Sequence, residues 1–228
     1  MASGETYEIE IKSLLGDQEA ADSFRSTLKS IHPTCALTST ESQLNHYFEG
    51  GDLHVLAECL APRLSSELQE KLERIVSRAT SASVRTRESD GEVRFVVKAS
   101  LGDDSSENGV VRAEFDVPME DVTLDELDNK ILEAGYTYQA KWSRNREVYE
   151  IPETTVCLDR NAGYGYLVEF EKVINDPSRT EEARAEIAAL MEQIGVEELP
   201  QDRLERMFAH YNEHWPEYYG TDKVFVIT

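Results

Sequence analysis

The amino-acid sequence predicts an α+β fold, an eight-stranded antiparallel β-barrel with flanking α-helices. Charged residues occupy every second position of most predicted strands, and these strands follow one another mostly in hairpin order. In the first strand, which reads YEIEIK, the alternation places Glu8, Glu10 and Lys12 on one face and the apolar residues on the other. Antiparallel strands with polar positions on one side are typical of a closed barrel.

Strands and helices alternate in the first half of the chain. A strand is expected at residues 5–14, and apolar residues at helical spacing predict a helix at 17–31. Two short strands are expected near 35–40 and 43–49. A strongly amphipathic stretch then predicts a helix at 63–80.

Turn and cap signals organise the second half. Asp90-Gly91 predicts a hairpin turn between SVRTRE and EVRFVVKAS. Thr123 and Glu126 form a capping box that opens a helix ending near Gly135. The remaining expected elements are strands at 109–117, 136–149, 153–159 and 164–174, helices at 179–194 and 201–214, and a short strand at 224–227.

The chain has 228 residues and shows neither a linker rich in Gly, Pro or Ser nor a repeat of fixed period. We therefore expect a single domain over 1–228, with a helical insertion near 54–82 and a helical C-terminal part near 178–215. No apolar run reaches the ~20 residues of a membrane span. The start of the chain lacks the basic and apolar regions of a signal peptide, so a cytoplasmic location is expected.

Composition narrows the classes of partner. The net charge is −22, which disfavours binding to nucleic acid or to an anionic membrane. A phosphate-rich substrate would need a basic pocket or bound divalent cations. Three widely spaced cysteines argue against a disulfide framework or a thiolate zinc site. The pair His210 and His214 is interpreted as part of an ordinary surface helix. A monomer or a homodimer is expected.

The charged pairs carry the functional signal. A single pair at period 2 usually marks the solvated face of a strand, but these pairs recur on most predicted strands. One alternative is a charge network that only stabilises a barrel, although such a network gains little over apolar packing. The pairs are Glu8 with Glu10, Arg85 with Arg87, Arg94 with Lys98, Arg112 with Glu114 and Asp116, Arg144 with Arg146, and Glu169 with Glu171.

These residues resemble the CYTH superfamily, also called triphosphate tunnel metalloenzymes, over residues 7 to 171. The opening Glu8-x-Glu10-x-Lys12 is the most specific mark. Asn45 stands where an aspartate is common, and Asp116 where a glutamate is more usual. The other marks, in family order, are Tyr47-Phe48, Arg85-x-Arg87 with Lys98, Arg112-x-Glu114, Arg144-x-Arg146, Asp159, Gly163 or Gly165, and Glu169-x-Glu171.

The resemblance implies a charged tunnel that binds a triphosphate together with Mg²⁺ or Mn²⁺. Arginine forks suit phosphate oxygens, and these hard cations prefer carboxylate oxygens. Arg94 and Asp116 are interpreted equally well as rim residues. The resemblance assigns Glu8, Glu10, Lys12, Glu169 and Glu171 as catalytic; Lys12, Arg85, Arg87, Lys98, Arg112, Arg144 and Arg146 as phosphate-binding; and Glu8, Glu10, Glu114, Asp159, Glu169 and Glu171 as metal ligands.

Three functions follow as hypotheses. The favoured one is a metal-dependent triphosphatase acting on inorganic tripolyphosphate or an organic triphosphate. The second is a class IV adenylate cyclase that makes cyclic AMP and pyrophosphate from ATP. The third is a polyphosphate- or nucleotide-binding module without turnover. The insertion near 54–82 could cap the tunnel mouth or build a nucleoside site. Five aromatic residues could stack a base, although core or rim packing is favoured: Tyr47, Phe48, Trp142, Tyr164 and Tyr166.

Overall fold

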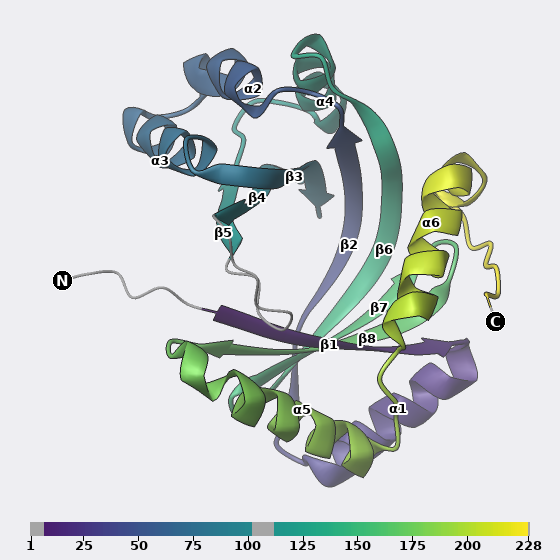
Figure 1. The fold of residues 1–228 in the computed structure, drawn as a ribbon. Coiled ribbons are helices and arrows are strands. Elements are labelled where there is room, and N and C mark those ends of the chain that lie inside the picture. The colour runs from purple at the N-terminus through teal and green to yellow at the C-terminus, as the bar shows by residue number, and fades with distance from the viewer. Residues whose placement is uncertain (1–6, 102–111, 228) are drawn as a thin grey trace. The chain divides into compact units, whose positions relative to one another are not determined.

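The structure is a computed structural model, and it describes residues 7–101 and 112–227 (Figure 1). The chain forms two compact units. Unit 1 comprises Met1–Ser42 and Ser143–Thr228, and unit 2 comprises Gln43–Trp142. Residues 5, 6 and 109–111, at the starts of two predicted strands, lie outside the described residues. No helix in the described part of the chain is long and apolar enough to cross a membrane.

Eight strands form the sheet in the order β1-β8-β7-β6-β2-β3-β4-β5. Two of them, β2 (Ala36–Glu49) and β6 (Thr137–Ile151), contribute residues to both units. The ladders resolved within each unit are all antiparallel. The predicted α+β class with eight antiparallel strands and flanking helices is therefore confirmed. Within 7–101 and 112–227, β1 and β5 stand at the two ends of the strand order, so backbone hydrogen bonds do not close the sheet.

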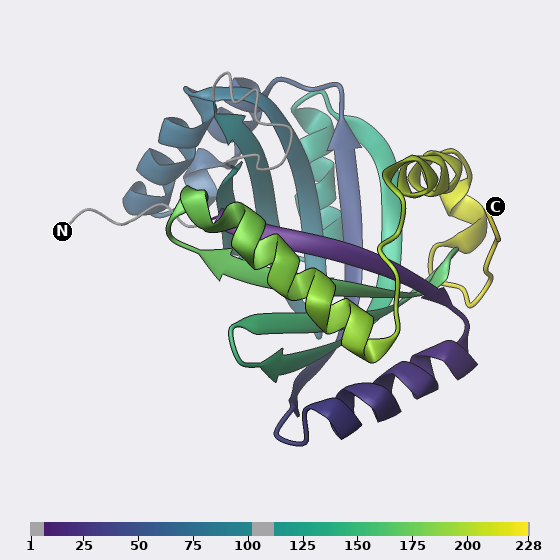
Figure 2. The same cartoon turned by 60° about the horizontal axis from the view of Figure 1, so that its bottom comes forward.

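Unit 1 is a sheet with an apolar and a charged face. Its apolar face carries Ile9, Ile11 and Phe170, which are buried against Phe24 and Ile187 of two helices. Figures 1 and 2 show these helices lying along the same side of the strands. Each large apolar side chain buried here contributes roughly 1.5–3 kcal/mol. The strands are β1 (Tyr7–Gly16), β7 (Thr154–Asn161), β8 (Gly165–Ile174) and part of β6, and the two helices are α1 (Gln18–Ile31) and α5 (Thr180–Ile194).

The last helix, α6 (Gln201–Tyr218), packs on the turn between β7 and β8. Gly163 in that turn has φ +94°, and a Cβ there would lie 2.6 Å from the ring of Tyr211. The backbone of Gly163 also bonds the chain after α6, because it accepts from the N–H of Phe225 at 2.5 Å. The short strand predicted at 224–227 is wrong in extent, since only an isolated bridge joins Gly163 to Val224.

Unit 2 repeats the two-faced plan with different elements. Leu60 and Leu72 of the covering helices are buried against Phe95 and Phe115 of the strands. Asp90 and Gly91 both have positive φ, as the predicted Asp-Gly hairpin turn requires. The strands are β3 (Ala79–Ser89), β4 (Glu92–Leu101), β5 (Arg112–Pro118) and the rest of β2 and β6; the helices are α2 (Leu53–Leu60), α3 (Ser66–Val76) and α4 (Leu124–Glu133).

Two predicted elements differ in extent. The strands expected near 35–40 and 43–49 are one continuous strand, β2, because the polar run between them is itself extended. The helix expected at 63–80 is α3, which spans only Ser66–Val76; α2 and a 3₁₀ turn over Ala61–Arg63 precede it, and β3 begins at Ala79. Leu64 is extended and Ser65 caps α3 through the N–H of Leu68, so the chain restarts its helix there.

Candidate functional site

Strand register gathers one set of predicted residues on the charged face of unit 1. Glu10 lies opposite Glu171, and Lys12 lies opposite Glu169. On β7, the neighbour of β8, Asp159 lies opposite Arg146 of β6. Directly opposite residues in an antiparallel pair place their side chains on the same face. This face therefore opposes the apolar one that α1 and α5 cover.

Three carboxylates of this face form a cluster. One oxygen from each of Glu10, Glu169 and Glu171 lies within 4.8 Å of the others. Burial raises the pKa of Glu171 to about 7, and the charges of Glu169, Glu8 and Glu10 add to this effect. Burial also raises the pKa of Glu10, with Glu169 contributing and Lys12 opposing. Glu8 is exposed, two residues before Glu10 on β1. Such crowding of like charge favours a bound cation.

Basic side chains stand beside the cluster. The Nζ of Lys12 lies 2.5 Å from Glu10 Oε1 and 3.6 Å from Glu169 Oε1. Arg146 donates to Glu169 through Nη2. Burial would raise the pKa of Glu169, but Arg146, Lys12 and Arg144 outweigh it and lower that pKa to about 2. Glu169 is therefore ionised at neutral pH, and Lys12 keeps its proton because Glu169 and Glu10 raise its pKa despite burial.

Asp159 binds the two arginines of β6. Its Oδ1 accepts from Arg146 Nε at 2.7 Å, and its Oδ2 accepts from Arg146 Nη2 and Arg144 Nη1, each at 2.7 Å. Its side chain is fully buried. Both oxygens are thus engaged by guanidinium groups, and Asp159 is not part of the three-carboxylate cluster.

Unit 2 holds most of the predicted phosphate-binding residues on its own charged face. Arg85 lies opposite Tyr47, and Arg87 lies opposite Asn45. Arg85 donates through Nη1 to the Tyr47 hydroxyl at 3.0 Å and places its Cζ 5.0 Å from the ring centroid. Arg87 donates through Nε to Asn45 Oδ1 at 2.9 Å. The buried Nε of Arg85 has no hydrogen-bond partner among the described residues.

The remaining charges of this face form pairs with acids. Lys98 Nζ lies 3.4 Å from Glu114 Oε1. Arg94 donates through Nε to Asp116 Oδ1 at 2.6 Å. Glu114 is therefore the partner of a lysine within unit 2. Arg112 begins β5, and its side chain lies outside the described residues.

The aromatic candidates separate into two groups. Phe48 and Tyr164 are buried, and Tyr166 packs with the apolar core of unit 1 and donates to Gln18 through its hydroxyl. Core packing, the favoured interpretation, therefore holds for these three. Tyr47 and Trp142 instead contact each other edge to face, with ring centroids 6.3 Å apart.

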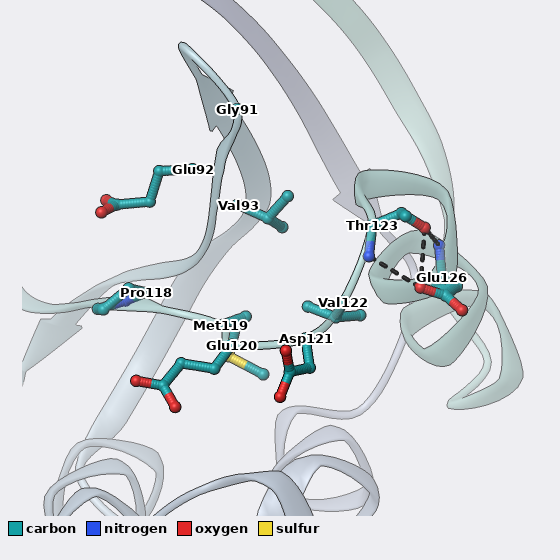
Figure 3. Close-up of a pocket in the computed structure, with 10 residues that line it drawn as sticks. All are labelled: Gly91, Glu92, Val93, Pro118, Met119, Glu120, Asp121, Val122, Thr123 and Glu126. Carbon is teal, nitrogen blue, oxygen red and sulfur yellow. Dashed lines mark hydrogen bonds between the residues drawn. The ribbon is translucent and has the colours of Figure 1, made fainter.

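A hollow of about 540 Å³ lies in unit 2 at the β3–β4 turn and the loop before α4 (Figure 3). It is lined by ten residues, among them Glu92, Glu120, Asp121 and Glu126. Glu126 is engaged in the capping box with Thr123, and Glu92 pairs with Arg94. None of the predicted site residues lines this hollow.

Sequence reasoning missed a buried polar cluster on the apolar side of unit 2. Asp128 of α4 accepts hydrogen bonds from Thr86 and Tyr138 and contacts His46. A signal was available: Asp128 occupies the apolar stripe of its helix, at the spacing of Leu124, Leu127 and Ile131. A charged residue at such a position needs partners.

Comparisons with known proteins give a family match and a fold. A family model described as the CYTH domain matches residues 73–203. The comparison with curated proteins gives no match. Among solved structures, a Pyrococcus horikoshii protein has a TM-score of 0.60 at 17% identity, covering 90% of this chain and 99% of that one.

Two further solved structures carry functional descriptions of their own. One, from Vibrio parahaemolyticus, is described as a candidate adenylate cyclase; its TM-score is 0.59 at 15% identity, covering 89% of this chain and 98% of that one. The other, from Hippeastrum, is described as a candidate adenylyl cyclase with a dominant triphosphatase activity. Its TM-score is 0.50 at 16% identity, covering 91% of this chain and 96% of that one. At these identities the likeness shows the fold.

Proposed function

Since the chain belongs to the CYTH domain family, we propose that it is a metal-dependent enzyme that hydrolyses triphosphate-containing substrates. The observation that carries the proposal is the cluster of Glu10, Glu169 and Glu171 beside Lys12 and Arg146. A cluster of carboxylates alone suits a cation, and basic groups alone suit an anion. Both together suit an anion bound with a cation.

The carboxylate cluster fits Mg²⁺ or Mn²⁺. Its three donors are all oxygens, which these hard cations prefer, and no sulfur or nitrogen ligand belongs to the cluster. A divalent cation would neutralise phosphate charge and lower the pKa of a bound water. We assign Glu8 as a further ligand because it shares this face of β1. For Asp159, proposed from the sequence as a ligand, the arginine contacts support a role as their counter-ion. Glu114 stays a proposed ligand.

The basic residues are proposed to bind the phosphate groups. Lys12 keeps its charge at neutral pH, and Arg144 and Arg146 are oriented by Asp159. In unit 2, Arg85 lies on the charged face, where it donates through Nη1 to the Tyr47 hydroxyl. Arg87, Lys98 and Arg112 complete the proposed set.

Within this proposal Glu8, Glu10, Lys12, Glu169 and Glu171 are the catalytic residues. Lys12 would stabilise negative charge that develops on the transferred phosphoryl group, and its contacts with Glu10 and Glu169 fix its ammonium group before substrate binds. The carboxylates would hold the cation. Burial and neighbouring carboxylates raise the pKa of Glu10 and Glu171, and a bound cation would offset the repulsion between their charges.

Cyclisation of ATP is the second candidate. It is favoured by the description of the Vibrio protein as a candidate adenylate cyclase, whereas the Hippeastrum protein is described as a candidate cyclase with a dominant triphosphatase activity. The two reactions differ in the attacking group: water in hydrolysis, the ribose 3′-hydroxyl in cyclisation. The aromatic pair Tyr47–Trp142 is the remaining candidate for contact with a base.

Product analysis tests the proposal. The protein is incubated with tripolyphosphate or ATP, with Mg²⁺, Mn²⁺ or EDTA. We expect phosphate and pyrophosphate from tripolyphosphate, ADP or AMP from ATP, and no turnover in EDTA. Glu10→Gln should lose activity, whereas the exposed Glu213→Gln on α6 should keep it. Cyclic AMP as the main product, with tripolyphosphate intact, would establish the cyclase; binding without any product would establish a binding module.

A further inference from the structure

The apolar side of unit 2 contains a buried carboxylate that the proposed function does not use. Asp128 is 1% exposed. Its Oδ1 accepts from Thr86 Oγ1 at 2.7 Å, and its Oδ2 accepts from Tyr138 OH at 2.7 Å and lies 2.6 Å from His46 Nδ1. Lys141 Nζ lies 3.7 Å from the same oxygen. These partners come from β2, β3 and β6, so a single side chain of α4 joins three strands.

The two partners of Asp128 on β2 and β3 lie between the residue pairs that contain Arg85 and Arg87. His46 lies directly opposite Thr86. The pairs on either side of them are Tyr47 with Arg85, and Asn45 with Arg87. Because side chains alternate between faces, those two pairs point away from Asp128, onto the charged face. Both pairs are hydrogen-bonded, at 3.0 Å and 2.9 Å.

We propose that Asp128 is a positioning residue for Arg85 and Arg87, and that it acts by fixing the register of β2 against β3. A slip of one residue would move both arginines to the apolar face and bring Val84 or Thr86 to the charged one. The apolar neighbours on these strands, such as Phe48 and Val84, fit several registers, because apolar contacts are non-directional. Hydrogen bonds between one carboxylate and the opposed pair His46 and Thr86 fit only one register.

The energetics of a buried carboxylate agree with a role in selecting one strand register. A buried charged group adds little net stability compared with apolar packing of the same volume, but removing it leaves its partners without an acceptor. Hydrogen bonds from His46 and Thr86 outweigh burial and lower the pKa of Asp128, so the group is an ionised acceptor at neutral pH. The inference rests on the proposed function, since it takes the two arginines to bind phosphate.

The test measures tripolyphosphate affinity by calorimetry at a temperature far below unfolding, with Ca²⁺ in place of the catalytic cation to prevent turnover. We expect Asp128→Asn to weaken binding at least tenfold. The matched control is Ile131→Ala, also buried on α4, which removes packing but no bond to a strand. It should lower thermal stability by a similar amount and leave the affinity within twofold of wild type.

A milder pair of variants covers the case in which Asp128→Asn does not fold. Thr86→Val removes the hydroxyl and should weaken binding at least threefold, whereas Thr86→Ser keeps the hydroxyl and should bind as wild type does. If Thr86→Val and Asp128→Asn bind as tightly as wild type, the positioning role is overturned while the proposed function stands. If Ile131→Ala loses affinity in parallel with Asp128→Asn, general destabilisation explains both, and the inference also fails. A wild-type protein that binds no tripolyphosphate would overturn the proposed function together with this inference.

Discussion

The two units share one plan but differ in the chemistry of their charged faces. Each has strands with an apolar face under helices and a charged face opposite. On the described part of the charged face of unit 1 the carboxylates outnumber the basic groups, and three of them converge within 4.8 Å. On the described strands of unit 2 the basic groups of the charged face outnumber the acids, and the acids Glu114 and Asp116 are paired with Lys98 and Arg94. The proposed cation site thus lies in unit 1, and most of the proposed phosphate-binding residues lie in unit 2.

Among the residues that the structure describes, each unit has one deeply buried aspartate, and the two hold arginines in different ways. Asp159 lies on the charged face and bonds Arg144 and Arg146 directly. Asp128 lies on the apolar side and reaches Arg85 and Arg87 only through the strands that carry them. A direct bond occupies part of each guanidinium, whereas a contact made through the strands does not itself occupy a guanidinium donor.

The largest expected effect comes from removing the direct bond. Asp159→Asn keeps the shape of the side chain but leaves two guanidinium groups beside a neutral amide. We expect the free energy of unfolding to fall by about 3–5 kcal/mol, the range for breaking a buried ion pair. Equilibrium urea unfolding measures it.

Two other variants calibrate this loss. Asp222→Asn removes a carboxylate that is 84% exposed and bonds Arg160, and it should leave stability almost unchanged. Asp128→Asn, whose carboxylate mainly accepts neutral or histidine donors, should cost about 1–3 kcal/mol. Equal losses from Asp159→Asn and Asp222→Asn would show that the buried arginines readily find other acceptors, and the contrast between the two aspartates would not hold.

A second prediction concerns the helices that cover unit 2. The sequence left open whether the insertion near 54–82 caps a tunnel mouth or builds a nucleoside site. In the structure α2 and α3 pack on the apolar side of their own unit, with Leu56 and Leu60 fully buried. Leu60→Ala should therefore cost about 2–5 kcal/mol of unfolding free energy. The ratio of ATP to tripolyphosphate turnover, measured on the folded protein, should not change.

The matched control on the same helix is Val55→Ala. Val55 is 43% exposed, so its truncation should cost much less. A Leu60→Ala protein with wild-type stability but an altered ratio of ATP to tripolyphosphate turnover would contradict this prediction and support a role of α2 as a lid.

The sequence predicted most of the fold because its signals were local. The alternation in β1, the Asp-Gly turn after β3 and the capping box of α4 each depend on neighbours a few residues away, and each is confirmed. Where the signal was weak, the prediction was wrong. The polar run between the halves of β2 contains neither Gly nor Pro, yet it was divided into two strands. The chain after α6 forms only one bridge, because its partner is the turn at Gly163.

The candidate site was predictable in its members but not in their arrangement. The family marks named Glu10, Glu169 and Glu171, and strand register brings them together. Sequence could not show that both oxygens of Asp159 are engaged by arginines, because its partners lie 13 and 15 residues away on another strand. It could have shown that Asp128 interrupts an apolar stripe.

The smallest expected effect tests the rim of unit 2. Arg94 donates to Glu92 at 2.5 Å as well as to Asp116, but Glu92 is 58% exposed. Water competes for both groups there, and salt screens them, so Glu92→Gln should cost less than about 1 kcal/mol of unfolding free energy. Repeating the urea experiment at high salt should remove most of this difference. The loss from Asp159→Asn should persist at high salt, because a buried pair is screened much less than an exposed one. A salt-resistant loss above about 2 kcal/mol in Glu92→Gln would place Arg94 among the structurally held arginines and would show that the charged face of unit 2 is organised like that of unit 1.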